Sequence, residues 1–350
     1  MKKSLIALAV MAAAGAASAQ SSVTLFGIVD ATLQWGFGET GDRFQLGNSG
    51  YNSSRLGFRG TEDLGGGMSA SFWLEAGVNN DNGTGGATNL NNTAAGVSAG
   101  NGLTFNRRST VSLAGNWGEL RLGRDYTPQF WNLTVFDPFG FNGVGTTALA
   151  LGGGVTGVTQ VRASNAIGYF LPARLGGFYG QVQYYAGEQL DNSPTEDDGN
   201  GLGLRVGYAQ GPFNVALALS RTQYATGDVS QNNLAGQWDF GMARLMGQIA
   251  RDSNDLGDVD GRGWLIGALV PVGAGEIRVS YSRYLVEQAG PNPRTQKFAL
   301  GYVHNLSKRT AVYTTWATVR NRNAATQLNG SAGGLGDDSS GLDVGIRHSF

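Results

Sequence analysis

The residues best placed to do chemistry in this sequence are arginines. All but four of the 25 basic residues are arginines, and five of them fall in three nearby segments: Arg55, Arg59, Arg108, Arg121 and Arg124. A guanidinium stays charged at any accessible pH and is less strongly hydrated than an ammonium group. Rows of such groups along a narrow aqueous passage favour anions. The chemistry indicated is therefore electrostatic filtering by fixed charge.

Catalysis by side chains is poorly supported. The chain has no cysteine and only two histidines, His304 and His348. Both share the apolar phase of their segments, whereas a Ser-His-Asp assembly needs an exposed and oriented histidine. We expect no enzyme activity, no catalytic residue, no metal site and no cofactor.

The first residues have the pattern of an export signal. Lys2 and Lys3 precede an apolar run from Leu5 to Ala14, and Ala17–Ala19 is an A-x-A cleavage site. We expect residues 1–19 to be removed and residues 20–350 to form one domain, because no composition break divides them. The mature chain has 23 basic and 26 acidic residues, which gives a net charge of −3 and argues against a nucleic-acid partner.

Apolar and polar residues alternate along nearly the whole mature chain. No apolar run approaches the roughly 20 residues that a membrane helix needs. The alternating segments suit the 9–11 residues of a tilted strand that crosses a bilayer. Sixteen such segments are predicted: 23–35, 55–62, 68–78, 105–114, 118–124, 165–170, 178–187, 202–210, 213–222, 233–240, 243–251, 262–270, 276–286, 295–305, 310–320 and 341–350.

The connections between these segments alternate between short and long. Short ones include 63–67 and 115–117, and long ones include 79–104 and 125–164. This alternation is typical of short periplasmic turns and long extracellular loops in an outer-membrane barrel. The fold class predicted is all-β, a 16-stranded antiparallel transmembrane β-barrel. A soluble β-sandwich is the alternative, but it would not need such long strands or such one-sided loop lengths.

The alternation also predicts which side chains face the lumen. Leu56, Phe58, Val111, Leu113, Leu120 and Leu122 take the lipid side, so Arg55, Arg59, Arg108 and Arg121 take the inner side. Arg124 falls where a strand gives way to the longest loop. Trp35, Trp264, Tyr302 and Tyr313 are expected at the membrane interfaces.

Five stretches spread along the chain resemble Gram-negative trimeric porins of the β-proteobacterial type. They are VTLFGIVD at 23–30, SRLGFRGTEDLGGG at 54–67, LGRDYTP at 122–128, LSKRT at 306–310 and VGIRHSF at 344–350. The resemblance implies a homotrimer of 16-stranded barrels, in which the third extracellular loop folds inward and narrows each pore. Here that loop would run from Asp125 to about Ser164, and its DPFG at 137–140 loosely matches a Pro-Glu-Phe-Gly tetrapeptide of related porins.

The predicted pore constriction has a basic wall and an inward loop that face each other. The wall comprises Arg55, Arg59, Arg108, Arg121 and Arg124, and the loop contributes Asp125, Asp137, Phe139 and Gly140. The alternative is structural: the arginines would only pair with Glu62, Glu75 or Glu119 and hold the wall together.

The predicted function is passive diffusion of small hydrophilic solutes and ions through a water-filled outer-membrane channel with an anion preference. A substrate-specific channel for phosphate, sulfate or carboxylate, and a plugged barrel that acts as an adhesin or receptor, stay open. The expected partners are two further copies of the chain, outer-membrane lipid and lipopolysaccharide, and the barrel assembly machinery through the strand that ends in Phe350.

Overall fold

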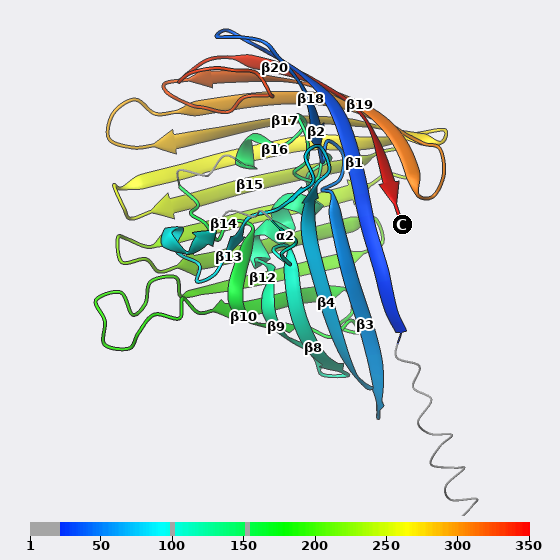
Figure 1. The fold of residues 1–350 in the computed structure, drawn as a ribbon, viewed down its shortest axis with the longest axis vertical. Coiled ribbons are helices and arrows are strands. Elements are labelled where there is room, and N and C mark those ends of the chain that lie inside the picture. Colours follow the sequence, from blue (N-terminus) through cyan, green and yellow to red (C-terminus); the bar gives the residue numbers. More distant parts are fainter. Residues whose placement is uncertain (1–21, 99–101, 151–154) are drawn as a thin grey trace, which may run out of the picture.

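The computed structural model describes residues 22–98, 102–150 and 155–350, and it shows a closed antiparallel β-barrel (Figure 1). The predicted signal peptide lies outside the described residues. Sixteen strands form the wall: β1 (Ser22–Gly38), β3 (Arg55–Gly65), β4 (Met68–Asn79), β8 (Arg108–Gly115), β9 (Gly118–Tyr126), β10 (Arg162–Phe170), β11 (Phe178–Tyr185), β12 (Gly201–Gln210), β13 (Phe213–Thr222), β14 (Val229–Asp239), β15 (Arg244–Asn254), β16 (Val259–Val272), β17 (Gly275–Glu287), β18 (Arg294–Asn305), β19 (Thr310–Arg322) and β20 (Ser339–Ser349). The predicted 16-stranded barrel is confirmed.

The barrel closes between its first and last strands, which lie side by side in Figure 1. β1 pairs with β20 from Ile28↔Ser349 to Gly38↔Ser339. The backbone groups of Gly27 and Phe350 also exchange two hydrogen bonds, each 3.1 Å long. Closure pairs the backbone groups of both terminal strands, as a sheet surrounded by lipid requires.

Short elements occupy the loops. β2 (Arg43–Asn48) pairs with the C-terminal half of β1. The loop after β4 contains four short elements: β5 (Thr84–Gly85), β6 (Thr88–Asn89), η1 (Ala94–Gly96) and β7 (Val97–Ser98). The connection between β3 and β4 is tight, because Gly65, Gly66 and Gly67 all take positive φ values that other residues rarely adopt. Among the described residues, no helix is long and apolar enough to cross a bilayer.

Strand parity sorts the side chains as the sequence predicts. The lipid-side leucines and valines of β3, β8 and β9 are partly or fully exposed on the outer face, and the arginines between them point inward. Two details differ. β8 begins at Arg108 rather than at residue 105, and Tyr313 points inward, where its hydroxyl donates to Asp30 Oδ1 at 2.5 Å. Tyr313 therefore is not an interface anchor, because Val312, Thr314 and Trp316 hold the outer phase of β19.

The connection from β9 to β10 enters the barrel, and its helix α2 (Pro128–Val135) lies inside the ring of strands (Figure 1). Pro128 suits the first turn of the helix, where its missing N–H costs no hydrogen bond. α2 packs against β11, β12, β13 and β14. Further on, Val144 N donates to Asp343 Oδ2 and Ala148 N donates to Ser282 Oγ, each at 2.9 Å. This inward loop thus crosses the lumen from β9 to the opposite wall.

Candidate functional site: an arginine-lined constriction

A polar cavity of about 500 Å³ lies between the inward loop and the barrel wall. Residues of the inward loop and residues of the barrel wall line it together. The residues around it include five arginines of the wall, a tyrosine from the β2–β3 connection, a tyrosine at the end of β9 and five loop residues that follow α2: Arg55, Arg107, Arg162, Arg244, Arg278, Tyr51, Tyr126, Asp137, Phe139, Gly140, Phe141 and Asn142.

Three of these arginines, which we call the constriction arginines, are Arg55, Arg107 and Arg162. Glu75 Oε1 accepts from Arg107 Nε at 2.6 Å and from Arg55 Nη1 at 3.3 Å. Two guanidiniums thus share one carboxylate, and among the described residues Arg162 has no carboxylate oxygen within 4.0 Å, so the three arginines and Glu75 together carry a net charge of +2. Charges this close to a narrow, low-dielectric passage act on every ion that crosses it.

Tyr126 joins two of the constriction arginines. Its phenolic oxygen accepts from Arg107 Nη2 at 2.7 Å and from Arg162 Nη2 at 3.0 Å. Because the oxygen accepts both bonds, its own proton stays available for donation. The cluster therefore presents hydrogen-bond donors of a kind that suits oxyanions.

The predicted wall residues divide into three groups in the structure. Arg55 lines the cavity. Arg59, Arg108 and Arg121, which we call the second row, point into the lumen along β3, β8 and β9 but do not line the cavity. Arg124 holds neighbouring segments together, since it donates to Asn106 O at 2.6 Å and to Ser164 Oγ at 2.8 Å.

Asp125 lies in β9 rather than in the inward loop, because the strand continues to Tyr126. Its buried carboxylate is 2.6 Å from Arg121 Nη1 and 3.7 Å from Arg108 Nε. Glu119 adds a second bond to Arg121 at 2.9 Å. Asp125 therefore sits on the same wall as the arginines and does not oppose them across the lumen.

The other predicted loop residues lie together at the cavity. The carboxylate of Asp137 accepts from Phe139 N at 3.0 Å and from Phe141 N at 3.1 Å, which caps the turn that contains Gly140. Burial raises the pKa of Asp137 to about 6, against the opposing effect of these two N–H groups. Phe139 is almost fully buried and packs with Val144, so it holds the turn in place.

Sequence reasoning missed several cavity residues, among them Arg107, Arg162, Tyr126 and Arg278. Strict alternation gives Arg107 the outer phase of Val111, but Arg107 precedes the first residue of β8 and its side chain turns inward. Arg162 and Tyr126 fell within the predicted loop, although they are paired residues of β10 and β9. Arg278 was predictable from the parity of β17, because Ile277 and Val279 flank it. A count of every inward arginine on all the strands would have found it.

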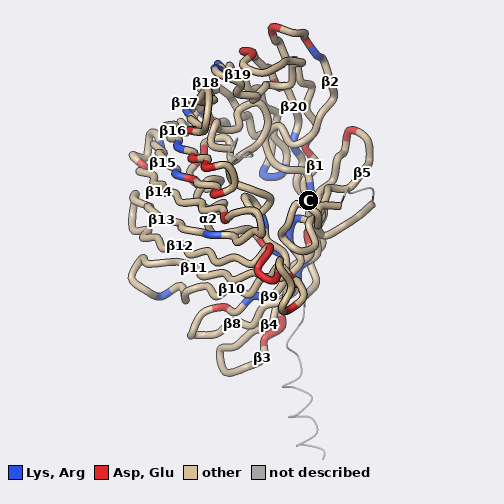
Figure 2. The backbone as a smooth tube through the Cα atoms, turned by 90° about the vertical axis from the view of Figure 1, so that its left-hand side faces the viewer, with Lys and Arg blue, Asp and Glu red and all other residues tan. Residues whose placement is uncertain are grey.

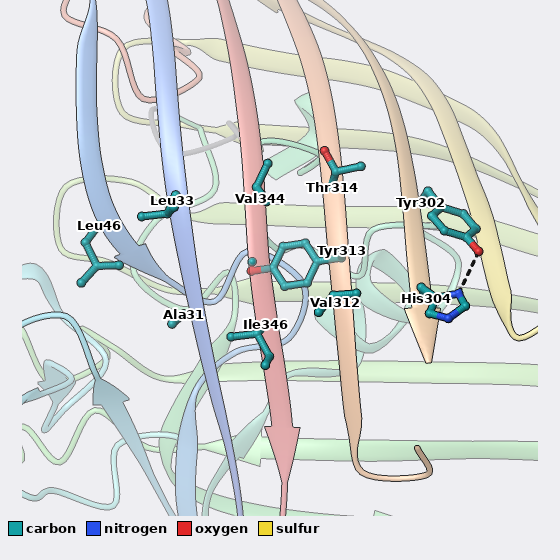
Figure 3. A pocket seen from close by; sticks show the side chains of 11 residues that line it. Ala31, Leu33, Leu46, Tyr302, His304, Val312, Tyr313, Thr314, Val344 and Ile346 are labelled. Carbon is teal, nitrogen blue, oxygen red and sulfur yellow. Dashed lines mark hydrogen bonds between the residues drawn. The ribbon is translucent and has the colours of Figure 1, made fainter. Parts of the chain in front are cut away.

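A second hollow, of about 510 Å³, lies on strands β1, β2, β18, β19 and β20 and is almost entirely apolar (Figure 3). Leu33, Leu46, Val344 and Ile346 line it and belong to the outer phase of their strands. At its edge Tyr302 Oη and His304 Nδ1 are 3.1 Å apart. Its apolar lining sets it apart from the charged passage inside the barrel.

Comparison with known proteins gives consistent matches over the whole chain. Residues 5–324 match the model of the Gram-negative porin family. Outer membrane porin protein 32 of Delftia acidovorans is 42% identical over the full length of both chains. The solved anion-selective porin from Comamonas acidovorans is 37% identical, with a TM-score of 0.81 over 95% of this chain and 100% of that one. The trimer form of OmpT from Vibrio cholerae shares the fold at 15% identity, with a TM-score of 0.67 over 94% of this chain and 99% of that one.

Proposed function

The chain belongs to the Gram-negative porin family and is an outer-membrane channel for small hydrophilic solutes, and on that premise we propose that it prefers anions. The observation that carries the proposal is the charge at the constriction. Arg55, Arg107 and Arg162 face the cavity with only Glu75 to compensate them. The 37% identical porin from Comamonas acidovorans is anion-selective, which supports the same preference.

The proposed mechanism is selection by a fixed field. An anion that enters the narrow passage gains from the uncompensated guanidiniums, while a cation loses by a similar amount. The loop contributes the opposite sign through Asp137 on the other side of the cavity. No bond to the solute is made or broken, and we propose that the barrel has no catalytic role.

The test is the reversal potential of single channels in a KCl gradient across a planar bilayer. We expect the sign of the wild-type reversal potential to show a preference for anions. The triple variant Arg55→Gln, Arg107→Gln, Arg162→Gln should lower the chloride-to-potassium permeability ratio at least about tenfold, because each charge a few ångströms away is worth about 1 kcal/mol even in water. A wild-type channel that prefers cations would overturn the proposal.

A matched control removes the same number of charges elsewhere. Arg174→Gln, Arg309→Gln and Arg320→Gln together change exposed arginines outside the cavity. This variant should keep the wild-type ratio, which would assign the effect to the constriction rather than to net charge. A plugged barrel that serves as an adhesin would give no steady conductance at all.

A substrate-specific channel is the second candidate. The specific observation for it is the cluster of Tyr126 with Arg107 and Arg162, whose donors suit a phosphate, sulfate or carboxylate. Block of the chloride current that saturates with one of these ions would favour this candidate. If the added ion instead carries a current that rises in proportion to its concentration, general diffusion is favoured.

We also propose a homotrimer, as the family resemblance implies. The apolar hollow on β1, β2 and β18–β20 in Figure 3 supports it, because such a surface gains from contact with another protein as well as with lipid. Unheated protein should run on an SDS gel as an oligomer that boiling converts to monomer.

The remaining proposals concern export and assembly. Cleavage after Ala19 would make Gln20 the first residue of the purified protein, which N-terminal sequencing can check. The barrel assembly machinery would bind the last strand, and removal of Phe350 should lower the amount of folded barrel. Lipopolysaccharide would contact the outer rim, which copurification with the native trimer would reveal.

A further inference from the structure

The arginines of the lumen lie over aromatic rings. The described residues make eight cation-π contacts, among them Arg121 over Phe170 at 4.0 Å and Arg162 over Tyr126 at 4.6 Å. A chain of this length would average about four or five. The arginines in these contacts point inward, so the stacking is a feature of the lumen and not of the outer surface.

Trp73 occupies the centre of this arrangement. Its ring centre is 5.1 Å from the guanidinium carbon of Arg59 and 4.7 Å from that of Arg108. Arg59 and Trp73 are cross-strand partners of β3 and β4, and the ring of Phe26 lies 5.2 Å from Arg59 and 4.9 Å from the ring of Trp73. One ring thus touches two of the three arginines of the second row.

Trp73 also reaches the constriction arginines. Its indole Nε1 donates to Glu75 Oε2 at 3.1 Å. The other oxygen of Glu75 is the one that accepts from Arg107 and Arg55. The indole therefore helps to orient the carboxylate that both of these arginines share.

An aromatic ring can hold an arginine in place without neutralising its charge, whereas a carboxylate cannot. A free arginine side chain samples many rotamers and would spread its charge through the lumen. A carboxylate would hold it but cancel its charge. Among the described residues, no carboxylate oxygen lies within 4.0 Å of the Arg59 guanidinium. For Arg108, an oxygen of Asp125 lies 3.7 Å away. A ring face attracts the guanidinium and adds no net charge.

We propose that Trp73 is a positioning residue for selectivity: its ring holds Arg59, which has no carboxylate partner among the described residues, and keeps Arg108 at a distance from Asp125, so that both stay on the anion path below the constriction. The inference rests on the proposed anion preference and deepens it. If the ring is lost, the two guanidiniums move, and Arg108 closes on Asp125. The field along the path then weakens although no charge has been removed.

The test compares Trp73→Leu with Trp73→Phe and wild type in planar bilayers under a KCl gradient. Trp73→Leu should lower the chloride-to-potassium ratio about threefold, the effect of losing stacking on two arginines. Trp73→Phe keeps a ring but not the N–H, and it should stay close to wild type. The loss should grow as salt is diluted, because screening weakens. If the leucine variant does not assemble, Trp73→Met takes its place.

The control is Trp316→Leu, which removes an indole from the outer face of β19. It should leave the ratio unchanged. An unchanged ratio in Trp73→Leu would overturn the inference alone, and so would an equal loss in Trp73→Phe, since the ring would then not be the cause. A wild-type channel that prefers cations would instead overturn the proposed function, whatever the Trp73 variants do.

Discussion

Between β3 and β10 the inner side of the wall carries six arginines, whereas on β11, on β14 and at the centre of β15 the inward polar side chains are mainly amides. The first region, which we call the arginine wall, carries Arg55, Arg59, Arg107, Arg108, Arg121 and Arg162. The second, the amide wall, carries Gln181, Gln183, Gln231, Asn233 and Gln248. Figure 2 shows the same contrast, since the strands from β11 to β14 carry few charged residues.

The contrast follows from what each wall faces. Asn233 Nδ2 donates to Gln129 O at 3.1 Å, and Gln248 Nε2 donates to Leu133 O at 3.1 Å. The amide wall thus satisfies backbone groups of the inward loop. The arginine wall faces the cavity and the neighbouring lumen, where water solvates charge. A lumen-facing polar residue therefore need not belong to the pore, and its type indicates whether water or loop covers it.

A charge placed on the amide wall should have the largest effect. Gln248→Glu replaces an almost fully buried amide, whose Nε2 donates to Leu133 O, by a carboxylate that cannot donate this bond. At pH 8 we expect the free energy of unfolding to fall by roughly 3 kcal/mol or more, the usual effect of an uncompensated buried charge. Thermal unfolding in detergent, followed by circular dichroism, measures it.

The matched control is Gln237→Glu. Gln237 points inward near the C-terminal end of the neighbouring strand β14, and it is only half-buried. It should lower the unfolding temperature far less. Equal losses in the two variants would mean that water reaches the amide wall, and the distinction between the walls would disappear.

A smaller effect should come from crowding the loop against the amide wall. A Cβ at Gly203 would lie 2.8 Å from Pro128 Cγ, at the start of α2. Gly203→Val should push α2 toward the arginine wall, destabilise the barrel by about 2 kcal/mol through overpacking and lower the single-channel conductance. The sign of the ion preference should stay the same.

Gly247→Val provides the comparison, because a Cβ there would meet only Leu265 O at an ordinary 3.8 Å. Its conductance should equal that of wild type. If Gly203→Val also conducts like wild type, the loop does not rest on β12 as described.

The alternation of residues was sufficient to predict the barrel and the inward side of Arg55, Arg59, Arg108 and Arg121. That prediction works because a strand in lipid must place every second side chain outward. It failed for Arg107, which lies just outside β8, where parity no longer applies.

The path of the inward loop could not be predicted in the same way. Its anchors join residues 134 and 199 positions apart, Ala148 to Ser282 and Val144 to Asp343. No local pattern encodes such pairs. The amide wall is therefore visible in the sequence as a set of inward residues, but its role becomes clear only from the loop that covers it.

The smallest effect tests the one acid of the loop that faces the arginine wall across the cavity. Burial raises the pKa of Asp137 from 3.8 to about 6, so this group is ionised at pH 7.5 and largely neutral at pH 5. Loss of its negative charge should raise the chloride-to-potassium ratio about twofold as pH falls through 6. The folded chain holds this proton more tightly than the unfolded chain, so the contribution of Asp137 to stability falls as pH rises from about 4 to 6.

Asp137→Asn isolates the effect of this carboxyl. The variant should show the higher ratio at both pH values, because its side chain is neutral throughout, and its stability should lack the fall between pH 4 and 6. The two histidines do not produce the same change, since His304 and His348 lie in the outer phase of β18 and β20, away from the cavity. If the chloride-to-potassium ratio of Asp137→Asn still rises as pH falls, the titrating group lies elsewhere. The loop would then contribute shape to the constriction but no field, and the arginine wall alone would determine selectivity.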